Sequence, residues 1–161
     1  MPILHTQFAG EVQQSDGSKV QLRPPQALQM RGPVIQVTVS VAQVVAETLL
    51  RLGRQLPPPV PGWALIDTGA SETCIDEEAA QQLKLPVIDV VNMVSASHAS
   101  TLQNVYPIRI ELVGLPITIN VPRTIGAALK PQGLLLLIGR EVLQHGTLMY
   151  NGLAGEITFA I

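Results

Sequence analysis

The residues of this chain best suited to chemistry follow directly after a short apolar run. Residues 63–66 are apolar, and Asp67, Thr68, Gly69 and Ala70 come next. A carboxylate at the end of a buried strand is costly unless its charge is used or well hydrogen-bonded, so Asp67 is a candidate acid–base group. The alternative is an ordinary turn, because Asp, Thr and Gly are common turn formers and such a triplet arises by chance in on the order of one chain in ten.

A second element downstream strengthens the first interpretation. Residues 134–138 form an apolar run that ends in Ile138 and is followed by Gly139 and Arg140. Together the two motifs resemble the signatures of the retropepsin-like family of aspartic peptidases, which carry an apolar-apolar-Asp-Thr/Ser-Gly-Ala sequence and later an apolar-apolar-Gly-Arg/Asp sequence. The resemblance extends over roughly Val34 to Ile161, including a final hairpin.

The resemblance implies a role for each residue of the two motifs. Asp67 matches the catalytic aspartate, and the other six residues would support the loop that carries it. Thr68 would bond across a dimer axis, Gly69 would pack closely under the site, Ala70 would line the floor of the cleft, Ile138 and Gly139 would cross behind the loop, and Arg140 would brace it. The implied fold is all-β, a closed acid-protease β-barrel with one or two short helices, acting as a homodimer.

A homodimer also follows from the chemistry of peptide hydrolysis. One ionised carboxylate must take a proton from water while a protonated one polarises the carbonyl, so two aspartates must share the site. The chain supplies one: Asp16 lies in a Gly/Ser turn, Asp76 is placed as a helix cap, and Asp89 lacks a following glycine. A two-fold axis would bring Asp67 beside its own copy, where like charges prevent both from ionising. No cofactor is expected.

A retropepsin also needs a hairpin flap that closes over the peptide or protein substrate. The best candidate lies within residues 94–101, with Ser95, Ala96, Ser97, His98 and Ala99 at its centre. This stretch contains no glycine, whereas retroviral flaps are glycine-rich. That departure favours a second hypothesis, in which the chain is a non-proteolytic dimerisation or peptide-binding module of the same fold. A domain excised from a larger polyprotein is a third possibility.

The elements that must position these residues are mostly strands. Apolar and polar residues alternate through 35–41, and paired runs predict hairpins at 108–112 with 117–121 and at 147–150 with 156–161. Two helices are predicted, over 76–84 with Asp76 as N-cap and over about 42–52 with Gly53 as the stop. Residues 57–62 predict a stiff proline-rich connector.

The chain therefore divides into two predicted parts. Residues 1–32 form an N-terminal extension, a hairpin with a turn at 15–18 and a break at Pro24 and Pro25. Residues 33–161 form the protease domain, with an insertion at about 42–62.

Composition excludes several other classes. The chain has 161 residues, 47% of them hydrophobic and 14% charged, and a net charge of −2, so nucleic-acid binding is not expected. Its apolar runs are too short to cross a membrane, and its first residues lack a signal peptide, so we expect a cytoplasmic protein. The three histidines are scattered, which argues against a metal site. Cys74 is more typical of a small buried residue than of a nucleophile, because no histidine base lies near it in sequence.

Overall fold

The computed structural model describes residues 1–95 and 98–161, and for residues 94, 95 and 98–100 it describes the backbone alone. Most of its elements are strands. The strands are β1 Ile3–Gln7, β2 Gly10–Gln13, β3 Lys19–Leu22, β4 Val34–Val41, β5 Val60–Ile66, β6 Cys74–Asp76, β7 Asp89–Ser95, β8 His98–Leu112, β9 Thr118–Ala127, β10 Leu136–Ile138, β11 Thr147–Asn151 and β12 Glu156–Ala160. The helices are α1 Pro24–Arg31, α2 Gln43–Arg51, α3 Glu77–Gln82, α4 Arg140–Leu143 and the 3₁₀ helix η1 Lys130–Gln132.

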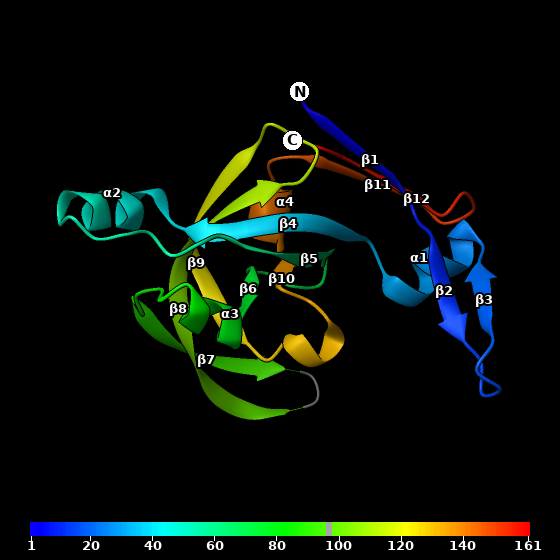
Figure 1. The fold of residues 1–161 in the computed structure, drawn as a ribbon, viewed down its shortest axis with the longest axis horizontal. Coiled ribbons are helices and arrows are strands. Elements are labelled where there is room, and N and C mark those ends of the chain that lie inside the picture. The colour runs from blue at the N-terminus through cyan, green and yellow to red at the C-terminus, as the bar shows by residue number, and fades with distance from the viewer. Residues whose placement is uncertain (96–97) are drawn as a thin grey trace.

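Six strands close into a barrel in the order β4-β5-β10-β6-β9-β8, because β8 also pairs with β4. β7 pairs with the outer part of β8 and extends the sheet beyond the barrel (Figure 1). The pairing β8–β9 confirms the hairpin predicted at 108–121, and the pairing β11–β12 confirms the C-terminal one. The predicted all-β closed barrel is therefore confirmed.

Alternating side chains explain why β4 forms part of the barrel wall. Ile35, Val37, Val39 and Val41 are each at most 3% exposed, and the residues between them point away from the core. This period of two is the one expected for a strand with a single buried face. The rest of the core is also mainly aliphatic, since the chain has few aromatic residues.

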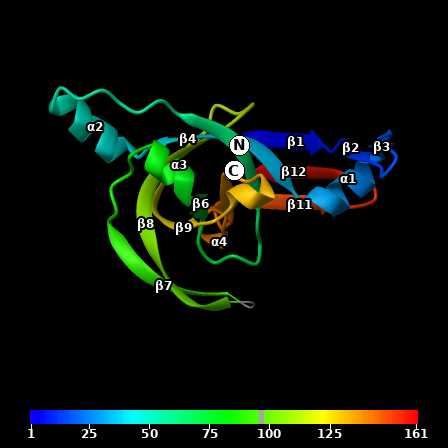
Figure 2. The ribbon, with the colours of Figure 1, turned by 60° about the horizontal axis from the view of Figure 1, so that its bottom comes forward.

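The N-terminal residues join a second, three-stranded sheet. β1 pairs with β12, and β12 pairs with β11, so the two ends of the chain lie close together (Figures 1 and 2). The β2–β3 hairpin follows β1, as predicted. β3 ends at Leu22, just before the predicted break at Pro24 and Pro25, and the helix α1, which was not predicted, begins at these prolines. Proline fits the first turn of a helix, where no intrahelical N–H bond is required.

The two predicted helices are confirmed, and they differ in how they pack. α3 begins after Asp76, whose carboxylate accepts a hydrogen bond from Ala79 N at 3.4 Å, and it buries Ala79 and Ala80. α2 has no buried residue and projects from the barrel (Figures 1 and 2). Among the residues described, no helix is long and apolar enough to cross a membrane.

The predicted connector at 57–62 is shorter than expected. Residues 60–62 pair with β4, in the register Val39 with Val60, Thr38 with Pro61 and Val37 with Gly62. Pro61 is tolerated because the pairing of β5 with β10 covers only Ala64 to Ile66, which leaves this part of β5 with β4 as its one described neighbour.

Candidate active site

Asp67 stands at the end of β5, where two parallel strands end together. Ile66 is 3% exposed and is paired with Ile138 of β10, and Asp67 N donates to Ile138 O at 3.0 Å. The Asp67 side chain is half-buried. Its Oδ1 accepts hydrogen bonds from Gly69 N at 2.8 Å and from Ala70 N at 3.3 Å. The stretch is therefore a turn, as its composition indicated, and the turn holds the carboxylate in place through backbone N–H groups.

Arg140 braces this turn from the first residue of α4. Its Nη1 donates to Thr68 O at 2.9 Å and to Gly69 O at 2.8 Å, and its backbone N donates to Ala70 O at 3.0 Å. The two motifs, far apart in the sequence, thus meet in one chain. The contact predicted for Arg140 is present, and the catalytic roles of the seven residues stay predictions.

Two residues that the sequence analysis missed hold the back of the loop. Gly139 N donates to Thr73 Oγ1 at 3.0 Å, and Thr73 N donates to Glu141 Oε1 at 2.7 Å. Thr73 is fully buried. Glu141 Oε2 is buried without a hydrogen-bond partner among the described residues. The signal available in the sequence was position alone: Thr73 lies between the turn and β6, and Glu141 follows Arg140.

Gly139 is required by the close approach of the two motifs. A Cβ placed there would lie 2.5 Å from the carbonyl carbon of Glu72 and 2.5 Å from Glu141 Oε2. A related but milder constraint acts at Gly69, where a Cβ would lie 3.1 Å from Asp67 Oδ1. Gly139 therefore allows two backbone segments to pack where a side chain would force them apart, and Gly69 leaves room for the Asp67 carboxylate.

Cys74 is a buried residue behind the site, as predicted. It is 3% exposed. Burial, with smaller contributions from the nearby carboxylates of Glu141, Asp67 and Glu72, raises the pKa of Cys74 to about 11. A thiol that resists ionisation is a poor nucleophile, so Cys74 packs rather than reacts.

The predicted flap falls on the far end of the β7–β8 hairpin. The backbones of Ser95 and His98 are paired across it, and Ala99 continues β8. Ala96 and Ser97 lie outside the described residues. In Figures 1 and 2 the hairpin extends from the barrel on the same side as the loop that carries Asp67.

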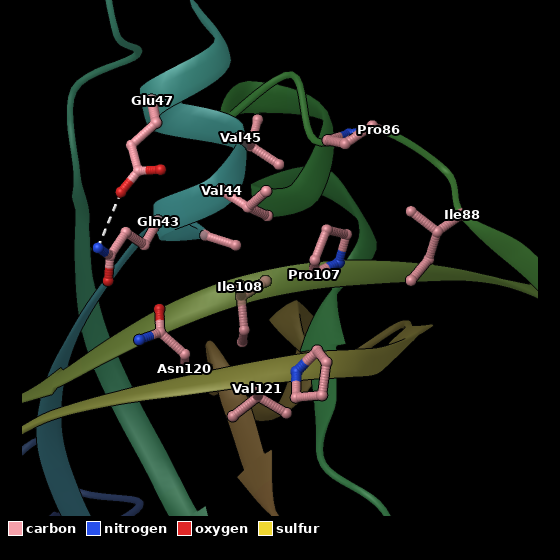
Figure 3. Close-up of a pocket in the computed structure, with 12 residues that line it drawn as sticks. Gln43, Val44, Val45, Glu47, Pro86, Ile88, Pro107, Ile108, Asn120 and Val121 are labelled. Carbon is pink, nitrogen blue, oxygen red and sulfur yellow. Dashed lines mark hydrogen bonds between the residues drawn. The ribbon is translucent and has the colours of Figure 1, made fainter.

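Two further observations concern ligands. No group of three or more His, Cys, Asp or Glu residues that could hold a metal occurs in the part of the chain that the structure describes. A cavity of about 690 Å³ lies between α2 and the barrel wall, lined by Val44, Val45, Pro107, Ile108 and Val121 among others (Figure 3). Its lining includes neither the Asp67 turn nor Gly139 and Arg140, so it is separate from the candidate active site.

The family model described as "gag-polyprotein putative aspartyl protease" matches residues 60–145, more than half of the chain. The chain belongs to this family. The matched residues include both motifs, so the resemblance to retropepsin-like aspartic peptidases that the motifs indicated is confirmed. No sequence among the curated proteins matches the chain.

Two solved structures are similar to this member of the aspartyl protease family. One is the crystal structure of a retropepsin-like aspartic protease from Rickettsia conorii, at 15% identity and a TM-score of 0.40, over 99% of this chain and 95% of that one. The other is the retroviral protease-like domain of Ddi1 from Leishmania major, at 17% identity and a TM-score of 0.38, over 73% of this chain and 81% of that one.

Proposed function

We propose that this chain is an aspartic endopeptidase that works as a homodimer, with a water molecule activated between two Asp67 carboxylates. The observation that carries the proposal is the Asp67 turn itself. The carboxylate is oriented by Gly69 N and Ala70 N, and the turn is braced from behind by Arg140. The guanidinium of Arg140, which comes from the distant second motif, fixes the turn and so supports a chemical task for the Asp67 carboxylate.

The exposure of the Asp67 turn supports the proposal that a second copy of the chain packs against it. Thr68 and Gly69 are exposed in the single chain, and Asp67 is half-buried. These residues are therefore accessible to a partner chain and to substrate. In the proposed dimer the two carboxylates share one proton, so one acts as base toward water and the other as acid toward the peptide carbonyl.

The substrate is proposed to be an extended peptide or protein segment. It would bind as an added strand between the turn and the β7–β8 hairpin, with main-chain hydrogen bonds giving affinity and alternate side chains giving selectivity. No cofactor takes part in this reaction scheme.

Asp67→Asn tests the chemistry, because it keeps the shape of the side chain and removes the ionisable group. Cleavage of a mixed peptide library should fall by at least about 100-fold, the usual contribution of a positioned acid–base group. Asp16→Asn is the matched control, since Asp16 is an exposed turn residue whose carboxylate contacts Ser18. Equal cleavage by the wild type and Asp67→Asn would refute the proposal, and it would favour a peptide-binding module that does not cut.

A mixing experiment tests the dimer separately. When an equal amount of Asp67→Asn is added to a fixed, saturating amount of wild type, random pairing should reduce cleavage to about half, because half of the wild-type chains then have an inactive partner. Asp16→Asn added in the same way should cause no loss. A site complete in one chain would give undiminished activity with either variant.

A further inference from the structure

A partly buried polar cluster joins α3 to β8 at the base of the β7–β8 hairpin. Glu77 is the first residue of α3, and Asn104 and Tyr106 lie two residues apart on β8, so they share one face of that strand. Glu77 Oε1 accepts hydrogen bonds from the Tyr106 hydroxyl at 2.6 Å and from Asn104 Nδ2 at 3.3 Å. Asn104 Nδ2 also donates to the Tyr106 hydroxyl oxygen at 3.1 Å. The three side chains form a closed network.

The network leaves one carboxyl oxygen of Glu77 without a hydrogen-bond partner among the described residues. Tyr106 is 3% exposed, and burial together with the bond to Glu77 raises the pKa of its hydroxyl, which therefore remains a donor. Glu77 Oε2 is buried with no partner among the described residues. It lies against Gly126 of β9, where any Cβ would overlap it. A buried carboxylate oxygen without a partner costs free energy that an apolar cluster of the same shape would avoid.

The cluster sits where β8 changes partners. From Val105 onward β8 pairs with β9, and from Ile108 onward also with β4, while the part of β8 before Tyr106 pairs with β7. Val105 is paired with both Asp89 of β7 and Ile125 of β9. The register with β9 shifts between Tyr106 and Ile108, an irregularity of the kind that bends a strand. The direction in which the hairpin leaves the barrel is therefore set beside Tyr106.

A second link at the base of the hairpin is weaker. Arg123 Nη2 of β9 lies 3.0 Å from Asp89 Oδ2 of β7, and both side chains are nearly half exposed. Exposed ion pairs of this kind contribute little to stability. The Glu77 cluster, which includes the buried Tyr106, is the more buried attachment of the two.

We propose that Glu77, acting through Tyr106 and Asn104, is a positioning residue that sets the angle between the β7–β8 hairpin and the barrel, and thereby how closely the hairpin covers a substrate bound at Asp67. The second part of this inference rests on the proposed function. The first part concerns the hairpin alone and can be tested without any cleavage.

Hydrogen exchange tests the attachment, with Tyr106→Phe as the perturbation. This change removes the hydroxyl and keeps the ring. Tyr150→Phe is the matched control, because the chain has two tyrosines and Tyr150 is a half-exposed residue of β11 outside the cluster. In Tyr106→Phe, backbone amides of residues 89–93 and 101–105 should exchange about tenfold faster, as expected for the loss of one hydrogen bond to a charged group. Amides of β4 and β10 should be unchanged.

Glu77→Ala, which removes the acceptor of both hydrogen bonds, should produce the same pattern, and the double variant should exchange little faster than either single one, because the two residues act in one network. Unchanged exchange in the hairpin overturns the inference. Equal acceleration in β4 and β10 also overturns it, because the cluster would then merely stabilise the whole fold.

Cleavage kinetics test the consequence for substrate. Tyr106→Phe should raise KM about five- to tenfold and leave kcat within about twofold, the pattern of lost binding rather than lost chemistry. Tyr150→Phe should change neither constant. If Asp67→Asn abolishes cleavage while Tyr106→Phe alters neither KM nor exchange, the inference fails and the proposed function stands. If the wild type cleaves nothing, the proposed function fails and the exchange experiment still decides the attachment.

Discussion

Replacing Gly139 with alanine should destabilise the fold through a single added methyl group. The backbone of Gly139 has φ −86° and ψ 177°, which any residue can adopt, so the change introduces no backbone strain. The new Cβ would instead lie 2.5 Å from the Glu72 carbonyl carbon, about 0.9 Å closer than an ordinary contact of 3.4 Å. Because Glu72 is met through its backbone and Gly139 N is bonded to Thr73 Oγ1, neither side can rotate away.

The expected cost is near the upper end of the usual range for an overpacked site, about 3 kcal/mol. For a domain of this size each kcal/mol lowers Tm by about 2–4 °C, so Tm should fall by about 6–12 °C. The assay is thermal unfolding at matched protein concentration, since dimerisation would make Tm concentration-dependent. Gly152→Ala is the control, because its nearest neighbour would be 3.5 Å away. A Gly139→Ala variant that unfolds with the wild type would refute the steric reasoning.

Three further predictions concern the Asp67 loop and the buried strand behind it. Arg140→Lys should lower kcat/KM by about tenfold or more, because the lysine side chain is shorter overall and its compact ammonium cannot take the position of the guanidinium between the two loop carbonyls; peptide cleavage by Arg51→Lys, at an exposed residue of α2, provides the control. Ala70→Ser should shift the pH–rate profile toward lower pH, because a hydrogen bond from the added hydroxyl favours the charged form of the Asp67 carboxylate. An unchanged profile would contradict this prediction. Because the pKa of Cys74 is raised, its neutral thiol contributes stability that is present below about pH 9 and lost as pH rises toward 11. The free energy of unfolding measured in urea should show this loss in the wild type and not in Cys74→Ala.

The parts of the fold that the sequence predicted are those governed by local patterns. The alternation in β4 reflects one buried face, and a period of two can be read directly from neighbouring residues. Asp76 was recognised as a cap because the capping bond joins residues three apart. The two motifs could also be related, although distant, because each combines an apolar strand with residues of restricted type.

The parts that escaped prediction depend on contacts between distant segments. Nothing in β1 indicates that it pairs with β12 at the other end of the chain. Glu77 looked like a residue suited to a helix N-terminus, and its bond to Tyr106 depends on how α3 lies against β8. The same is true of Glu141, whose bond to Thr73 closes the back of the loop. The break at Pro24 and Pro25 was predicted, but the helix α1 that begins at these prolines was not.

The completeness of the Asp67 loop within one chain constrains how the proposed dimer could control activity. The loop is held by Ile138 O, Arg140 and its own carboxylate, all from the same chain. Formation of the dimer would then only have to add the second Asp67 carboxylate, and the loop would not have to refold. We therefore expect the rate to rise with the square of protein concentration below the dimer dissociation constant and linearly above it, with no lag after dilution or mixing beyond the association time itself. A slow activation phase after association, independent of protein concentration, would show instead that the loop is rebuilt by the partner.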